Sequence, residues 1–357
     1  MSDDRFHALH EIVAEARAVL GNGPWGYLAG GAETETTVAR NRAAIDSIAF
    51  RPRVLRDVST IDASATLLDR PVRLPVFVAP VGQLTHFTPG AAATAAEAAA
   101  EFGVGQMLSS ASPPGIEEVS AAAPEGLRIY QLYVTGDEQF VTDRVKRVEN
   151  DGWSGFCLTV DVAKYSRRER DIANRWGIRW QTRGLEGGGF LAALSWADVE
   201  RVRSQTELPL ILKGIATPQD AELAIEHGVD VVYVSNHGGR QLDHGLGSIE
   251  VLPEIVETVN GRAKVYVDGG FCRGSDIVKG IALGADAIGL GRITCYGLAA
   301  GARDGLVRVF ELLEDEVHRT LGLLGLTGWD GLDTSYLTAA EPQVEAHVLS
   351  AFPLVEL

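Results

Sequence analysis

Apolar runs rich in Val, Ile and Leu recur from residue 76 onward, and each is followed by a turn residue and a segment of helical periodicity. Continuous apolar strands that alternate with helices are typical of a parallel sheet covered on both faces. Eight such strands in succession predict an α/β fold, a closed (β/α)8 TIM barrel. The runs occupy residues 76–80, 103–109, 128–134, 155–161, 208–214, 229–236, 263–270 and 285–292.

The rest of the chain divides into a leading segment, an insertion and a tail. The leading segment contains an amphipathic helix near 4–20 and an extended stretch from Phe50 to Leu74. The wide spacing between the fourth and fifth runs makes 162–194 an insertion after strand four, and its flexible GLEGGG at 184–189 favours a lid above the barrel face where active sites form. We therefore predict one domain, composed of an N-terminal helical cap at 1–75, the barrel at 76–322 and a tail of unassigned role at 323–357.

Composition and charge exclude several classes of protein. Hydrophobic residues make up 46% and charged residues 22% of the 357 residues, which disfavours a disordered, collagenous or coiled-coil chain. The 32 basic and 48 acidic side chains give a net charge of −16, which opposes binding to nucleic acid and to anionic membranes. An anionic ligand therefore requires a local basic pocket.

The cysteines and the N-terminal segment bear on the compartment. Cys157, Cys272 and Cys295 are an odd number without C-x-x-C spacing, so neither a disulfide framework nor a zinc site is indicated. The start MSDDRFHALHEI lacks the basic and apolar regions of a signal peptide, and no run of 18 apolar residues occurs. We expect a soluble, unanchored protein of the cytoplasm.

Polar residues stand where nearly every predicted strand ends. These ends surround the ligand site of a (β/α)8 barrel. A single such residue is more simply a turn former or a helix cap, but the recurrence at every strand indicates a functional site. The series is Pro80, Ser109, Gln131 with Tyr133, Thr159 with Asp161, Lys213, His237, Asp268 and Arg292.

Two glycine-rich strings follow the last two strands. They are DGG at 268–270 and GLGR at 289–292. Barrels commonly bind phosphate here through backbone N–H groups and a helix N-terminus, and Arg292 adds a cation. Tight turns alone also explain such glycines. A phosphorylated cofactor or substrate is the functional interpretation.

The segment SNHGGRQLD at 235–243 brings His237 and Arg240 to the end of strand six, where Asp161 can converge from strand four. A neutral imidazole oriented by a carboxylate is a general base, and an arginine offers a fork for a carboxylate. The alternative is a buried histidine with satisfied hydrogen bonds. That alternative leaves the basic residues without a role, namely Arg240, Lys213 and the pair Arg167 and Arg168.

With these residues the chain resembles the FMN-dependent 2-hydroxy acid dehydrogenase and oxidase family, which includes glycolate oxidase, lactate oxidase, mandelate dehydrogenase and hydroxymandelate oxidase. SNHGGRQLD is close to the family signature. Further similar motifs follow in order along most of the chain, namely YLAGGAETE, NRAAIDSIAFRPRVL, APV, QLYV, LTVD, RRERD, LKGI, DGG and GR.

The resemblance implies a catalytic role for each matching residue. His237 would be the base, and Asp161 would stabilise its protonated form. Tyr133 would hydrogen-bond the substrate hydroxyl, while Arg168 and Arg240 would clamp the substrate carboxylate. Chemistry supports this division, because a carboxylate needs cationic donors and the base needs a stabilised conjugate acid.

The resemblance also implies FMN as the cofactor. Tyr27 would touch the substrate carboxylate, and Lys213 would stabilise negative charge at the flavin N1/O2 edge. The isoalloxazine would be lined by Ala79, Pro80, Ser109, Gln131, Thr159 and Ser235. The ribityl chain and phosphate would be held by Asp268, Gly270, Gly291 and Arg292.

The phosphate side departs from the family pattern. Where the family shows DGG-x-Arg, this chain has DGGFCRG, so Cys272 occupies the arginine position and Arg273 is displaced by one. We expect Arg292 and backbone N–H groups to hold the phosphate, with Arg273 as a further candidate.

The substrate side departs as well. Glycolate-oxidising relatives have a Trp after the Ser pair that follows strand two, whereas this chain has Ala111. The pocket is thereby opened, which predicts a mandelate-like aromatic substrate, with Tyr27, Tyr133 and Trp176 as aromatic walls. The alternative is that residues 172–194 refill the space.

The resemblance thus implies FMN-dependent oxidation of a 2-hydroxy carboxylic acid to the 2-oxo acid. Oxygen is the expected acceptor, because neither a haem domain nor a membrane segment is recognisable. Alternatives are lactate or a larger biosynthetic 2-hydroxy acid with a non-oxygen acceptor, and, in a different class, a non-catalytic phosphate-binding barrel. Similar proteins are often tetramers, so a homotetramer is expected.

Overall fold

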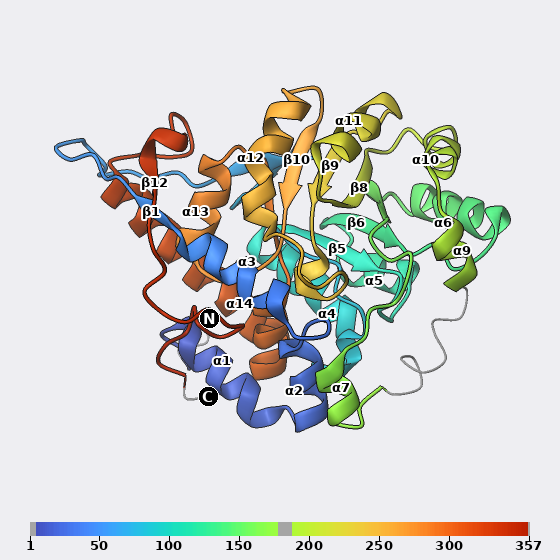
Figure 1. The fold of residues 1–357 in the computed structure, drawn as a ribbon, viewed down its shortest axis with the longest axis horizontal. Coiled ribbons are helices and arrows are strands. Elements are labelled where there is room, and N and C mark those ends of the chain that lie inside the picture. The colour runs from blue at the N-terminus through green and yellow to red at the C-terminus, as the bar shows by residue number, and fades with distance from the viewer. Residues whose placement is uncertain (1–4, 178–187, 356–357) are drawn as a thin grey trace.

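Eight parallel strands form a closed barrel in the computed structural model, which describes residues 5–177 and 188–355 (Figure 1). Their order around the ring is β10-β11-β4-β5-β6-β7-β8-β9, with β9 paired to β10. Each of the eight predicted runs overlaps one strand, so the predicted (β/α)8 barrel is confirmed. The strands are β4 (Val76–Val78), β5 (Gly105–Ser109), β6 (Leu127–Leu132), β7 (Gly155–Thr159), β8 (Leu210–Ile215), β9 (Val231–Val234), β10 (Lys264–Val267) and β11 (Ala287–Leu290).

Helices cover the outer face of the barrel, and their ends follow the expected signals. Thr217 stands just before Pro218 at a helix start, and its hydroxyl accepts a hydrogen bond from the Asp220 N–H. Gly284 lies just past the end of another helix and has a φ of +97°. The helices after the strands are α4 (Ala91–Phe102), α5 (Ile116–Ala122), α6 (Glu138–Asn150), α10 (Trp196–Arg203), α11 (Pro218–Glu226), α12 (Ser248–Val259), α13 (Gly274–Ala282) and α14 (Arg292–Leu324). The barrel mouth is thereby left to the loops between strands and helices.

The first 75 residues reach both ends of the barrel. Leu67 and Val72 from the β2–β3 hairpin pack with Phe77 and Met107 inside the barrel, and Leu67 approaches Gly105 at the start of β5. The hairpin therefore closes the N-terminal end, whereas the helices before it supply residues to the opposite end. These elements are α1 (Leu9–Val19), α2 (Asn22–Ala29), α3 (Thr36–Asp46), β1 (Ile48–Phe50), β2 (Ala65–Leu67) and β3 (Arg70–Val72).

The tail pairs with the leading segment. Strand β12 (Leu337–Ala339) lies antiparallel to β1, after the short helix η3 (Thr334–Tyr336). Phe352 packs edge-on against Tyr296 of α14. A segment without a sequence signal thus joins the two ends of the chain.

The insertion after β7 contains α7 (Glu169–Ala173) and α9 (Gly188–Ala193). The lid prediction centres on GLEGGG, of which residues 184–187 lie outside the described residues, so it stays a prediction. None of the described helices combines the length and apolar character that crossing a bilayer requires.

Candidate active site

A cavity of about 450 Å³ opens at the C-terminal ends of the strands. Its walls come from strand ends and from α2 and α3. Many of the predicted site residues line it, namely Tyr27, Ala79, Pro80, Ala111, Tyr133, Arg168, Lys213, His237, Arg240, Asp268, Gly270, Gly291 and Arg292. The predicted residues outside the lining are Ser109, Gln131, Thr159, Asp161, Ser235 and Arg273.

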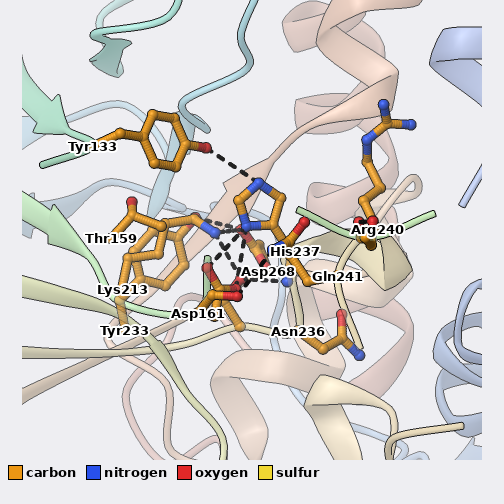
Figure 2. Close-up of polar contacts among 12 residues, drawn as sticks. Tyr133, Thr159, Asp161, Lys213, Tyr233, Asn236, His237, Arg240, Gln241 and Asp268 are labelled. Carbon is orange, nitrogen blue, oxygen red and sulfur yellow. Dashed lines mark hydrogen bonds and ion pairs between the residues drawn. The ribbon is translucent and has the colours of Figure 1, made fainter. Parts of the chain in front are cut away.

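His237 lies between Asp161 and Tyr133 (Figure 2). Its Nδ1 is 3.0 and 3.2 Å from the two Asp161 carboxylate oxygens, and its Nε2 is 3.2 Å from the Tyr133 hydroxyl. Because a carboxylate only accepts, Nδ1 carries the proton and the Nε2 lone pair faces the cavity. This is the orientation that a general base requires.

The backbone after β9 aims the imidazole. His237 begins the short helix η2 (His237–Gly239) with a φ of +58°, a conformation that a side chain rarely adopts. Its N–H donates to Ser235 Oγ at 3.0 Å, and the Asn236 side chain accepts from Gly239 N–H at 3.1 Å. At Gly239 a Cβ would lie 2.7 Å from the backbone nitrogen of Val38, so only glycine fits against α3.

Burial and charge set the protonation of this cluster. Burial lowers the pKa of His237, and the Asp161 carboxylate only partly offsets this. Burial alone would raise the pKa of Asp161, but the charge and hydrogen bond of His237 lower it below the ordinary carboxyl value. Burial raises the pKa of Tyr133, which therefore remains a neutral hydrogen-bond donor. At neutral pH the cluster holds a neutral base backed by an anion.

Lys213 is a buried cation at the cavity floor. Its Nζ donates to Ser235 Oγ at 2.7 Å and lies 3.3 Å from Asp268 Oδ2. Asp268 also accepts from Ser235 at 2.6 Å and from the Tyr233 hydroxyl at 2.9 Å. Burial lowers the pKa of Lys213, but Asp268 and Asp161 outweigh it and raise the pKa, so the ammonium keeps its charge. Sequence reasoning missed Tyr233, because it stands inside an apolar strand.

Two guanidinium groups lie on the substrate side of the cavity. Arg240 Nη1 donates to the carbonyls of Tyr27 and Gly30 at 2.5 and 2.8 Å, while its buried Nη2 has no hydrogen-bond partner among the described residues. Arg168 Nη2 donates to the Arg240 carbonyl at 3.2 Å. Burial and the charge of Arg240 lower the pKa of Arg168. A carboxylate between them would relieve this repulsion and satisfy the open donor.

The part of the cavity at the start of α14 is suited to a phosphate. Arg292 donates to the carbonyls of Leu28, Gly238 and Gly30 at 2.8–2.9 Å, at the start of the long helix α14. At Gly291 an added Cβ would meet nothing within 4 Å, which leaves room for a ligand beside the helix N-terminus.

Arg42 is a cation of the cavity lining that sequence reasoning missed, whereas the predicted Arg273 lies outside the lining. Arg42 of α3 lines the cavity and donates to the Gly270 carbonyl at 3.2 Å and to Asp276 at 2.7 Å. Arg273 instead pairs with Glu316 and donates to the Ala351 carbonyl. Only the fold brings α3 here, so no local signal could have identified Arg42.

Four of the predicted flavin-facing residues are outside the cavity lining, namely Ser109, Gln131, Thr159 and Ser235. Gln131 Nε2 donates to Thr159 Oγ1 at 2.8 Å, and its buried Oε1 has no partner among the described residues. Ser109 Oγ accepts from the Ala111 N–H at 3.2 Å. The unpaired Oε1 of Gln131 is an acceptor suited to an N–H group of a ligand ring.

Residues 16–339 match the model of the FMN-dependent dehydrogenase family. The chain belongs to this family. It is 38% identical to an L-lactate oxidase of Nostoc sp., over 92% of this chain and 97% of the relative, and 36% identical to the glycolate oxidase of Spinacia oleracea, over 93% and 95%. A solved mandelate oxidase structure superimposes with a TM-score of 0.86 at 36% identity, over 94% of this chain and 99% of that chain.

The cofactor of this FMN-dependent dehydrogenase family member is FMN, and the residues present fit it. The open acceptor of Gln131 suits the ring, and the cation of Lys213 suits a flavin edge that becomes negative on reduction. Arg292 and the open backbone at Gly291 suit the phosphate. The predicted roles of Ala79, Pro80, Ser109, Thr159 and the remaining lining residues stay predictions.

Replacing His237 by Ala should leave FMN bound and remove most turnover. A general base contributes roughly 10²–10⁴-fold to the rate, and the imidazole is not among the groups expected to hold FMN. The flavin absorbance spectrum checks the first expectation and steady-state kcat the second. A variant with the wild-type rate would show that another group is the base.

Two arginine variants separate the candidates for the phosphate. Arg292→Gln should weaken FMN binding by roughly 10- to 100-fold, because a charge-assisted hydrogen bond contributes about 1.5–3 kcal/mol. Arg273→Gln should have little effect, since Glu316 already holds that guanidinium. Titration of the apoprotein with FMN, followed by flavin fluorescence, measures both. Equal losses in the two variants would place Arg273 at the phosphate as well.

Proposed function

We propose that the protein oxidises an aromatic, mandelate-like 2-hydroxy acid to the 2-oxo acid and that oxygen accepts the electrons. FMN-dependent 2-hydroxy acid oxidation is the activity of its relatives. The observation that supports the proposal most is the grouping of His237 Nε2, Tyr133 and two guanidinium groups on one cavity. A base beside paired cations suits a substrate that carries a hydroxyl next to a carboxylate.

In this proposal the arginines anchor the substrate. Arg168 and Arg240 take the carboxylate, and the open Nη2 of Arg240 supplies one of the donors. Tyr27, whose ring lies 4.5 Å from the Arg240 guanidinium carbon, completes this side. The carboxylate then directs the hydroxyl-bearing carbon toward His237, which converts binding energy into orientation.

His237 accepts the proton that leaves the substrate. Its Nε2 carries the lone pair because Nδ1–H is engaged by Asp161. The Asp161 carboxylate stabilises the imidazolium that forms, and Tyr133 donates a hydrogen bond to the substrate oxygen. FMN supplies a two-electron acceptor when bound, and Lys213 offsets negative charge beside it.

The size of the substrate follows from the wall at Ala111. A Cβ added at Gly82 would lie 3.3 Å from the Ala111 Cβ, and the Ala111 carbonyl accepts from the Gln83 N–H at 3.0 Å. Thr135 and Phe140 also line the cavity. Trp176 lies outside the lining and packs on His86 at 5.0 Å between ring centroids.

Ala111→Trp should reverse the substrate preference. In the wild type, mandelate should be oxidised faster than lactate or glycolate, because each buried methylene contributes about 0.8 kcal/mol. The indole should fill the space beside Gly82 and remove the mandelate activity. Measurements of kcat/KM for the three acids decide this. If glycolate is the best wild-type substrate, or if the variant keeps full mandelate activity, Ala111 does not determine specificity.

Oxygen as acceptor is tested by anaerobic mixing. The flavin absorbance should bleach when mandelate is added without air and should return when air is admitted, with formation of hydrogen peroxide. Bleaching that persists in air would indicate a quinone or protein acceptor. The cytoplasmic location and the homotetramer also remain predictions.

A further inference from the structure

One wall of the cavity has no role in the proposed reaction. Past Ala111 the lining continues to Thr135 after β6 and to Phe140 and Arg144 on α6, with Tyr130 of β6 beside them. Neither the base nor the arginines that anchor the carboxylate belong to this wall.

Arg144 is the charged residue of this wall. Its side chain is partly buried, and its guanidinium carbon lies 4.9 Å from the centre of the Phe140 ring. Across the described residues it forms no hydrogen bond and no ion pair. A cation that lies on an aromatic face without a hydrogen-bond partner keeps its donors available for a ligand.

The nearby acidic group is already neutralised. Glu117 forms two hydrogen bonds with Arg147, one turn further along α6, at 2.8 and 2.6 Å. Arg147 lies outside the cavity lining, whereas Arg144 faces the cavity. On helix α6, Arg147 is therefore paired with Glu117, whereas Arg144 lines the cavity.

The positive charge of Arg144 also reaches the cavity wall beside it. Burial raises the pKa of Tyr130, and the charge of Arg144 opposes this shift more than that of Arg147 does. A chain with a net charge of −16 repels dianions unless a local cation compensates. The cavity lining therefore carries Arg144 on α6 in addition to Arg168 and Arg240, which follow β7 and β9.

We propose that Arg144 and Phe140 form a second anion subsite and that the substrate is a 2-hydroxy acid with a further carboxylate at its far end. This rests on the proposed function, because the 2-hydroxy acid head must first be held by Arg168 and Arg240. Ala111 leaves the passage between the two ends open, and Phe140 covers the ring or chain that spans it. A guanidinium suits a carboxylate because its donors match both oxygens.

The test compares substrates that differ only in the distal group. One pair is 4-carboxymandelate and 4-methylmandelate, and a second series compares 2-hydroxy dicarboxylates of increasing length with monocarboxylates of the same length. We expect the holoenzyme to prefer the dicarboxylate in kcat/KM in at least one pair. Arg144→Gln should reduce that preference by roughly tenfold or more, and Arg144→Glu should invert it.

Arg147→Gln is the matched control, because it removes one charge from the same helix outside the cavity. It should retain the wild-type preference. The absorbance of bound FMN in each variant confirms that the fold is intact. A preference that survives Arg144→Gln, or falls equally in both variants, would overturn the subsite.

Two outcomes distinguish the subsite from the function on which it rests. If monocarboxylates are oxidised and no dicarboxylate is preferred at any length, the subsite is wrong and the proposed function stands. If no 2-hydroxy acid reduces the flavin, both are wrong. Calorimetric titration with 2-oxo acids that carry or lack the distal carboxylate gives a readout independent of turnover, and Arg144→Gln should weaken only the former.

Discussion

The hydrogen bond between Asp161 and His237 is the contact on which the site depends. It joins the ends of β7 and β9, which are separated in the ring by β8, and so depends on the pairing of these three strands. It fixes the tautomer of the imidazole and turns Nε2 to the cavity. It also explains the left-handed conformation of His237, whose cost of about 1–3 kcal/mol must be offset by the surrounding contacts.

The second constraint is the concentration of cations in an acidic chain. Lys213 is balanced by Asp268, but the described hydrogen bonds of Arg240 and Arg292 go to carbonyl oxygens rather than to carboxylates. Carbonyls solvate a guanidinium without cancelling its charge. Such a cavity is suited to anionic ligands such as a phosphate and a carboxylate.

The sequence pattern predicted the features that depend on residues close together in the chain, namely the strands and the polar residues at their ends. The apolar runs revealed all eight strands, and the polar residues at their ends pointed to His237, Asp161 and Lys213, which the structure brings to one face because parallel strands deliver their ends there. Contacts between distant segments could not be read in this way. Arg42 reaches the phosphate end only through the packing of α3, and the pairing of β1 with β12 joins the two ends of the chain. Arg273 pairs with Glu316 of α14, a residue distant in the sequence, so the local motif around Cys272 could not predict where the Arg273 side chain points.

The most direct test of the account is the pH dependence of kcat/KM in the wild type and in Asp161→Asn. Burial holds the pKa of His237 below the ordinary 6.5. The kcat/KM of the wild type should therefore stay constant around neutral pH and fall only at a pH below 6.5, where the base becomes protonated. Asp161 raises the pKa of His237, so the Asn variant should show a lower plateau and a decline displaced to still lower pH. An acid limb at the same pH in both proteins would contradict the assignment of His237 as a base tuned by Asp161.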